Sequence, residues 1–161
     1  MIKNQITPCL WFDNQAEEAA VFYTSIFKNS KIEDISRYGK EGFEVHGQKE
    51  GTVLTVSFQI NGQSYTALNG GPIFKFDESV SFQVFCDNQA EIDHYWYKLV
   101  EGGSEGQCGW LKDKFGLSWQ IVPSMLPELM SNPKTSGKVM EAFMQMKKFD
   151  IEKLSIAATN S

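Results

Sequence analysis

The sequence contains one short stretch twice, first as Asp13-Asn14-Gln15-Ala16-Glu17 and then as Asp87-Asn88-Gln89-Ala90-Glu91. The two copies lie 74 residues apart, and Tyr23 recurs at the same interval as Tyr97. A second similarity joins the segments 62–68 and 116–122 at an interval of 54 residues. The shorter interval indicates an insertion of about 20 residues in the first copy, and the polar, Gly-bearing loop 39–51 is its expected place. The chain is therefore predicted to consist of two similar modules.

Hydrophobic periodicity predicts the same order of elements, βαβββ, in both modules. In the first module, strands are expected at 6–12, 31–38, 52–60 and 64–69, with a helix from about Gln15 to Phe27. Pro8 favours an edge position for the first strand, and Asn61-Gly62 is typical of a tight hairpin. In the second module, a helix carries a stripe of Ile92, Tyr95, Trp96 and Leu99, and later strands are expected near 107–112 and at 118–123.

Both helices have a predicted N-terminal capping box. Asn14 is followed three residues later by Glu17, and Asn88 is followed in the same way by Glu91. The repeat therefore predicts the same cap at the start of each helix.

The segment after Ser124 is predicted to be a helical tail. A short helix is expected over 125–130, a longer one is expected to start at Asn132-Pro133, and Asp150 is expected to cap a final turn. The apolar stripe of the longer helix contains Val139, Met140, Phe143, Met144 and Met146. The sequence thus predicts one domain over 1–161, with a first module at 1–76, a second at 77–123 and the tail at 124–161. The predicted fold class is α+β.

Composition limits the class of protein. The chain has 161 residues, of which 42% are hydrophobic and 22% charged, as in ordinary globular domains. A net charge of -5 argues against nucleic acid as a partner, because a nucleic-acid footprint needs a basic face. The sequence shows no apolar run long enough to span a membrane and no signal-peptide pattern at its start, so a cytoplasmic protein is expected. The three cysteines are therefore expected to be free thiols.

Strand alternation separates each predicted sheet into two faces. One set is apolar and is expected to lie under the helices: Leu10, Phe12, Leu54, Val56, Phe58, Ile60, Phe82, Val84, Cys86, Trp119 and Ile121. The other set mixes polar and aromatic residues, and it is the set that holds Trp11 and Phe85. Aromatic walls with a few hydrogen-bonding groups are typical of a small-molecule cavity. A face filled by the protein's own side chains or by a partner chain is the open alternative.

The predicted ligand-binding residues come from this mixed set and its surroundings. They are Trp11, Cys9, Ser57, Gln59, Gln83, Phe85, Trp110 and Gln120. The aromatic residues would stack on a ligand, and the amides and the hydroxyl would form hydrogen bonds with it. No catalytic residue is identified: His46 is interpreted as an exposed loop residue, and Lys112-Asp113-Lys114 as a hairpin turn with solvated charges.

Several motifs resemble the PhnB-like branch of the vicinal oxygen chelate superfamily, which includes glyoxalase I, bleomycin-resistance proteins and extradiol dioxygenases. The resemblance extends over nearly the whole chain. It rests on residues 7–13 with 16–19, on Asn69-Gly70-Gly71-Pro72 with Phe74 and Phe76, on 109–116 with 119–123, and on Met144, Met146, Lys147 and Lys148 with Asp150-Ile151. It implies paired βαβββ modules of the glyoxalase/bleomycin resistance/dioxygenase type, and it implies a homodimer.

Metal-using relatives take one ligand from the first strand and one from the last strand of each module. In this sequence those positions fall at Thr7, Ser81, Thr66 and Gln120. Because Thr and Ser are poor ligands for a transition metal, no metal and no cofactor are predicted. Proteins of this branch are often labelled 3-demethylubiquinone-9 3-methyltransferases, although this sequence has no glycine-rich loop of the kind that binds nucleotide-like cofactors.

Three functional hypotheses follow. The first is metal-independent binding of a small aromatic or polar metabolite in a cavity between the two modules. The second is a metal-dependent lyase, dioxygenase or transferase of the superfamily, in which Gln120, His46 and groups of another chain surround a metal. The third is a structural homodimer whose cavity is filled by protein.

Overall fold

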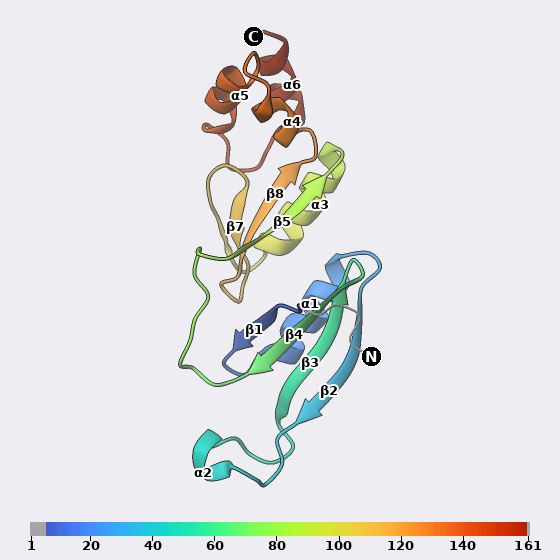
Figure 1. Ribbon diagram of the computed structural model, residues 1–161, viewed down its shortest axis with the longest axis vertical. Coiled ribbons are helices and arrows are strands. Elements are labelled where there is room, and N and C mark those ends of the chain that lie inside the picture. The colour runs from blue at the N-terminus through green and yellow to red at the C-terminus, as the bar shows by residue number, and fades with distance from the viewer. Residues whose placement is uncertain (1–5, 161) are drawn as a thin grey trace. The chain divides into compact units, whose positions relative to one another are not determined.

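The computed structural model describes residues 6–160. It contains two compact units, Met1–Lys75 and Phe76–Ser161 (Figure 1). Each unit contains one four-stranded sheet.

The first unit has the predicted βαβββ order. Its elements are β1 (Cys9–Phe12), α1 (Ala16–Ile26), β2 (Lys31–Arg37), the short α2 (Phe43–His46), β3 (Val53–Ile60) and β4 (Gln63–Asn69). The sheet order is β1-β4-β3-β2, in which β1 runs parallel to β4 and the other neighbours are antiparallel. The helix α2 lies in the loop that the sequence predicts to be an insertion.

The second unit repeats this topology with shorter outer strands. Its elements are β5 (Ser81–Cys86), α3 (Gln89–Val100), β6 (Ser104–Glu105), β7 (Trp110–Lys112) and β8 (Ser118–Pro123). The sheet order is β5-β8-β7-β6, and again only the first pair is parallel. The tail follows as α4 (Leu126–Ser131), α5 (Ser136–Phe143) and α6 (Ile151–Thr159). The predicted α+β fold of paired βαβββ modules with a helical tail is confirmed.

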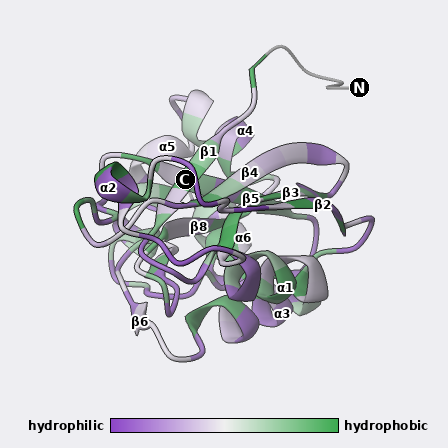
Figure 2. Cartoon of the chain, turned by 90° about the horizontal axis from the view of Figure 1, so that it is seen from below, coloured by the Kyte–Doolittle hydropathy of each residue, from purple (hydrophilic) through white to green (hydrophobic). Residues whose placement is uncertain are grey.

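The cores lie where strand alternation predicts them, under the helices. Phe12, Val56 and Phe58 of the first sheet are buried, as are Trp119 and Ile121 of the second. Tyr23 of α1 is buried with them, as are Ile92, Trp96 and Leu99 from the predicted stripe of α3. Hydrophobic and hydrophilic residues alternate along both helices (Figure 2), which is typical of helices that cover one face of a sheet. The opposite face of each sheet, called here its polar face, carries the mixed set.

The two predicted capping boxes differ in outcome. The Asn88 side chain accepts a hydrogen bond from the Glu91 backbone N–H at 2.9 Å, and Glu91 in turn accepts one from the Asp87 N–H at 2.8 Å. The cap at Asn14 is wrong, because α1 has no side-chain cap from its own N-terminal segment. The Ala16 N–H instead donates to Asn69 Oδ1 at 2.9 Å. Because β4 ends beside the start of α1, a residue distant in sequence supplies the acceptor.

Other boundaries shift for local reasons. β1 begins at Cys9, since its pairing with β4 starts where the Pro8 carbonyl accepts from the Thr66 N–H. α5 begins at Ser136 and not at Asn132, whose carbonyl closes a turn by accepting from the Thr135 N–H. The predicted stripe of α5 is only partly buried: Val139 is inside, and Met140 and Met144 are exposed.

The tail packs on the second unit through backbone pairing. The N–H groups of Cys108 and Gly109 donate to the carbonyls of Met146 and Lys147. A Cβ at Gly109 would lie 2.3 Å from the Phe149 ring, so only glycine fits beneath this ring.

Candidate functional site

Three of the predicted ligand-binding residues form one row on the polar face of the second sheet. Strand register places Trp110 of β7 opposite Gln120 of β8, and Gln120 opposite Gln83 of β5. The Gln120 amide nitrogen donates to Ser81 Oγ at 2.8 Å, and the Gln83 amide nitrogen donates to Gln120 Oε1 at 3.5 Å. The row therefore presents an indole beside a short chain of linked amides. Phe85 lies further along β5 and is 52% exposed.

The next row on the same face contains a lysine among serines. Register aligns Ser104, Lys112, Ser118 and Ser81 across the four strands. The Lys112 ammonium forms an ion pair with Glu78 at 2.5 Å, and the two side chains are 41% and 59% exposed. The hydrogen bond from Lys112 lowers the pKa of the Glu78 carboxyl, so this carboxyl is ionised at neutral pH.

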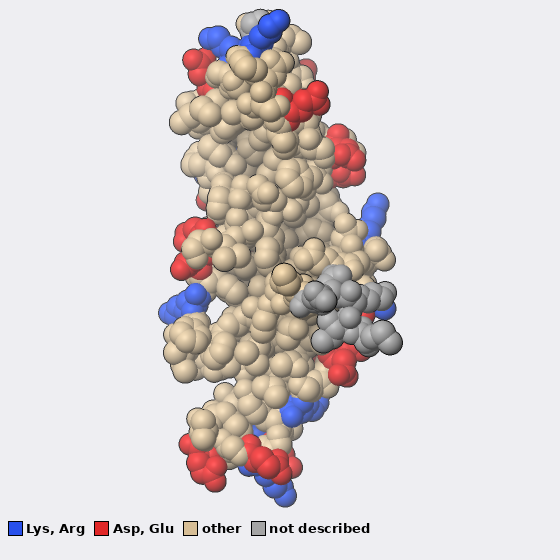
Figure 3. Space-filling view, viewed as in Figure 1, with Lys and Arg blue, Asp and Glu red and all other residues tan. Residues whose placement is uncertain are grey.

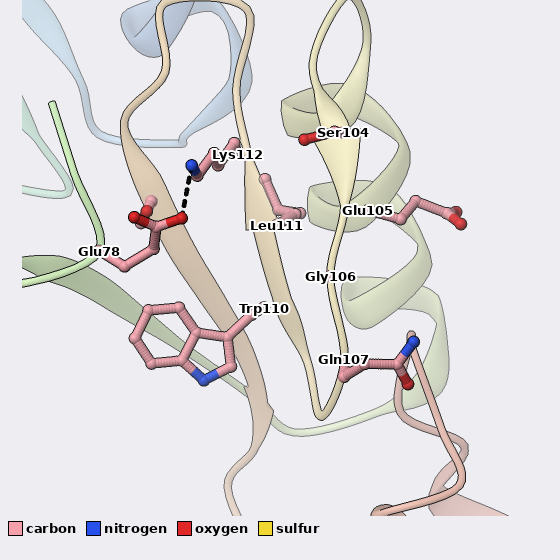
Figure 4. A pocket seen from close by; sticks show the side chains of 9 residues that line it. Glu78, Ser104, Glu105, Gly106, Gln107, Trp110, Leu111 and Lys112 are labelled. Carbon is pink, nitrogen blue, oxygen red and sulfur yellow. Dashed lines mark ion pairs between the residues drawn. The ribbon is translucent and has the colours of Figure 1, made fainter. Parts of the chain in front are cut away.

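A cavity of about 540 Å³ opens beside this row (Figure 4). Its lining comes from β6, β7, their connection, β8 and the segment before β5: Glu78, Ser104, Glu105, Gly106, Gln107, Trp110, Leu111, Lys112 and Ser118. Figure 4 shows Glu78 and Lys112 pointing toward one another, with the Trp110 indole below the Glu78 side chain.

Ser118 stands out among the lining residues. Its side chain is fully buried, at 0% exposure, and Oγ has no hydrogen-bond partner among the described residues. A buried hydroxyl without a partner is rare in folded proteins because it costs about 1–3 kcal/mol. Because Ser118 is one of the residues that line the cavity, a molecule bound there would lie beside this residue.

The polar face of the first sheet carries smaller groups. Register aligns Cys9 with Thr66 and Thr66 with Ser57, and in the adjacent row Trp11 aligns with Leu68 and Leu68 with Thr55. Gln59 is only 7% exposed, and its amide donates to the Glu33 carboxylate at 2.6 Å. Glu33 lies at a bulge in β2, which turns it toward Gln59.

Trp11 is held by the loop that follows β4. Its indole N–H donates to the Gly71 carbonyl at 2.8 Å, and its ring meets Phe74 edge-on with ring centroids 4.9 Å apart. A Cβ at Gly70 would lie 2.2 Å from the Trp11 ring, so the glycine permits this close approach. The motif Asn69-Gly70-Gly71 thus fixes both the start of α1 and the orientation of Trp11.

The predicted site residues fall into two groups. Cys9, Trp11, Ser57 and Gln59 lie in the first unit, and Gln83, Phe85, Trp110 and Gln120 in the second. Sequence reasoning missed Glu78, Lys112 and Ser118 as neighbours of one cavity. It was wrong to treat 112–114 as a turn with solvated charges, because Lys112 belongs to β7 and Asp113 is buried. The sequence feature that could have indicated the role of Lys112 is its two-residue spacing from Trp110, which puts both side chains on one face of a strand.

Asp113 is structural. Its carboxylate accepts from the Trp119 indole N–H at 2.9 Å and from the backbone N–H groups of Phe115 and Leu117. These bonds fix the turn between β7 and β8, and thereby the positions of Lys112 and Ser118 at either end of the turn.

His46 and the cysteines have no partners that suggest catalysis. His46 Nδ1 accepts from the Gln48 N–H, so the other nitrogen donates to the Glu41 carbonyl at 2.9 Å. The three cysteines are free thiols, as predicted. Burial raises the pKa of Cys9 and, with smaller contributions from Glu91 and Asp87, raises that of Cys86 to about 12.

The donors at the superfamily's metal positions do not fit a transition metal. Ser81 and Gln120 bond to one another, and Thr7 and Thr66 offer only hydroxyls. Within residues 6–160, no three His, Cys, Asp or Glu residues gather in a group that could hold a metal ion. No step of a reaction is therefore assigned to a metal here.

The fold and these motifs define a protein of the glyoxalase/bleomycin-resistance type within the vicinal oxygen chelate superfamily. Residues 4–122 match the model of the 3-demethylubiquinone-9 3-methyltransferase family, and the chain belongs to this PhnB-like family. The PhnB protein from Bacillus cereus is 37% identical, with a TM-score of 0.66 over 74% of this chain and 99% of that chain. No curated protein sequence matches the chain.

Two more distant structures share the fold alone. A protein from Pseudomonas aeruginosa is 19% identical, with a TM-score of 0.59 over 75% of this chain and 98% of that chain. The fosfomycin resistance protein FosX from Listeria monocytogenes, solved with Mn(II) and sulfate, is 15% identical, with a TM-score of 0.52 over 81% of this chain and 98% of that chain. In the described part of this chain, no helix is long and apolar enough to cross a membrane.

Proposed function

We propose that this protein binds a small aromatic or polar molecule on the polar face of its second sheet, without a transition metal. The observation that carries the proposal is the cavity beside Trp110. Its lining includes the buried Ser118 hydroxyl, which has no hydrogen-bond partner within residues 6–160. Cavities that combine an aromatic wall with a few placed polar groups are the usual form of small-molecule sites.

Each side chain of the row has a distinct role in this proposal. The Trp110 indole provides a flat surface for stacking. Gln120 and Gln83 are already aligned by hydrogen bonds to Ser81 and to one another, so they offer oriented amide groups. A site whose polar groups are ordered before binding loses less entropy when the ligand arrives.

The proposal also includes the polar face of the first sheet. Trp11, Cys9, Ser57 and Gln59 are proposed to contact the same ligand, enclosed between the two modules, and the protein is proposed to act as a homodimer. The fixed orientation of Trp11 supports its use as a second stacking surface.

Ligand binding is tested by thermal-shift screening of aromatic metabolites against the full chain and two variants. A ligand that binds the native state raises the melting temperature with its concentration. Compounds that stabilise the natural protein should lose most of this effect in Trp110→Ala and part of it in Trp11→Ala. Tyr97→Ala is the matched control, because Tyr97 is an exposed aromatic residue on α3 outside the cavity.

Metal analysis and chromatography complete the test. Protein purified without chelator should contain no stoichiometric zinc, nickel, manganese or iron, and added metal should leave ligand binding unchanged. One bound transition metal per chain would overturn the metal-independent assignment. Elution as a monomer at every concentration would overturn the homodimer.

A further inference from the structure

We infer that the cavity in the second unit recognises the anionic group of its ligand, a carboxylate or a phosphate, through Lys112 and Ser118. The inference rests on the proposed function and specifies the ligand class for the same cavity. It departs from the predicted site, which contains neither residue.

Lys112 is the cation that faces this cavity. Among the described residues that line it, no other basic side chain occurs. Because Lys112 is part of a three-residue strand that pairs on both sides, its backbone is fixed by β6 and β8. Its cross-strand neighbour Ser118 holds the buried hydroxyl that has no hydrogen-bond partner in the described part of the chain. An ammonium and a hydroxyl side by side are two donors for one anion.

The two carboxylates that line the cavity differ in how easily a ligand could displace them from their cation. Glu105 accepts from the Trp96 indole N–H at 3.2 Å and pairs with Lys147 at 3.4 Å, so its charge is already matched. Glu78 has Lys112 as its ion-pair partner and comes from the segment before β5. An exposed ion pair of this kind contributes little stability. A ligand anion that also reaches Ser118 can therefore replace the Glu78 carboxylate on Lys112.

Trp110 adds the second element of recognition. It lies two residues before Lys112 on the same face of β7, so an aromatic ring on the indole would place its acidic substituent near the ammonium. A charge-assisted hydrogen bond is roughly twice as strong as a neutral one. The favoured ligand is therefore an aromatic acid or an aromatic phosphate ester, with Glu78 as the group that it displaces.

The test uses the full-length ¹⁵N-labelled protein and follows the indole N–H signals of its four tryptophans. Trp110→Phe assigns the signal at the cavity. The probes are indole-3-acetate, its neutral analogue indole-3-acetamide, and inorganic phosphate. The acetate should shift the Trp110 signal with about tenfold higher affinity than the acetamide.

Three variants separate the roles. Lys112→Gln should remove the preference for the acetate, and Glu78→Gln should strengthen acetate binding by about two- to fivefold because the competing carboxylate is gone. Lys114→Gln is the control: this lysine follows β7, lies outside the cavity lining, contacts Phe115, and should leave both affinities unchanged. Circular dichroism spectra confirm that each variant is folded.

The outcomes distinguish the inference from the proposed function. Equal affinities for acetate and acetamide at Trp110, or a preference that survives in Lys112→Gln, overturn the inference while ligand binding stands. No shift of the Trp110 signal by any of the probes at about 10 mM also overturns it. The proposed function fails only if the wider thermal-shift panel shows no ligand whose effect depends on Trp110.

Discussion

The polar faces of the two sheets share one backbone plan but carry different side chains. Equivalent positions hold Cys9, Thr66 and Ser57 in the first unit and Gln83, Gln120 and Trp110 in the second. The first row consists of short groups, and the second of long amides and an indole. Because the helices and sheet order are the same, the duplicated modules differ mainly in the chemistry of these faces.

The next row of each polar face also differs between the two units. Gln59 in the first unit and Lys112 in the second occupy equivalent places, opposite Ser64 and Ser118. Gln59 is buried and bonded to Glu33, whereas Lys112 is partly exposed and paired with Glu78. A carboxylate contacts both residues, but Gln59 is 7% exposed whereas the Lys112 side chain is 41% exposed. The carboxylate bound to Lys112 is therefore expected to be replaced by a ligand more readily than the one bound to Gln59.

The largest expected difference is in the rate of thiol labelling, which compares a cysteine on a polar face with a cysteine in a core. Cys9 is exposed and Cys86 is buried. Cys86 should react about a thousandfold more slowly, because it becomes accessible only when the core opens. Mass spectrometry of iodoacetamide-treated native protein measures both rates.

The pH dependence of labelling follows from the pKa values. Thiolate is the reactive form, and burial raises the pKa of both thiols, to about 12 for Cys86. The Cys9 rate should therefore still be rising above pH 9. If Cys9 is also labelled slowly, its polar face is covered in solution. If Trp11→Ala then restores fast labelling of Cys9, the cover lies on the face that carries Trp11.

The turns between the last two strands of each unit also differ, and substitution of Asp113 is expected to have the second largest effect, on the free energy of unfolding. The first unit uses the tight Asn61-Gly62 turn, whereas the second uses a longer turn built around the buried Asp113. Asp113→Ala should lower the free energy of unfolding by about 3 kcal/mol, because the Trp119 indole and two backbone N–H groups lose their acceptor. Urea unfolding followed by circular dichroism measures this loss.

Asn61→Gly is the control for that comparison. Asn61 has a φ of 49°, which glycine adopts readily, so this variant should change stability by less than about 0.5 kcal/mol. A similar cost for both variants would show that Asp113 is not the anchor of its turn.

Most of the fold could be predicted because its signals are local. Alternation in 9–12 and the stripe of Ile92, Trp96 and Leu99 report burial directly, and the repeat carries the prediction from one module to the other. The parallel pairing of each first strand with the last joins residues that are far apart in the sequence, so no local pattern predicts it.

The cavity could not be predicted in the same way. Glu78 comes from a segment without periodicity, and Lys112 precedes two charged or turn-forming positions, so both look solvated in the sequence. The strand expected near 107–112 includes Lys112, but the sequence does not show that Lys112 pairs with Ser118. The Asn69 cap was missed for the same reason, since its partner Ala16 is 53 residues away.

Substitution of Asn69 is expected to have the third largest effect. Its Oδ1 accepts from Ala16 and its amide donates to the Val53 carbonyl, and the residue is buried. Asn69→Ala should cost about 2 kcal/mol of unfolding free energy by urea titration, because both groups lose a partner. Asn69→Asp keeps the acceptor and should retain part of that stability. A loss equal to that of the alanine variant would argue against the cap.

The equivalent of Asn69 in the second unit is Pro123, which has no side-chain acceptor. The second helix therefore depends on its own N-terminal segment. This explains why identical stretches of sequence, Asp-Asn-Gln-Ala-Glu, cap one helix and not the other.

The smallest expected effect tests this explanation with a matched pair of variants. Asn88→Ala should lower the free energy of unfolding by about 1 kcal/mol, because the Glu91 N–H loses its acceptor. Asn14→Ala should change it by less than about 0.5 kcal/mol, since α1 takes its cap from β4. Urea unfolding of both variants under identical conditions gives the difference. Equal losses would mean that the repeated stretch caps both helices in solution, and the contribution of Asn69 to α1 would then have to be reassigned.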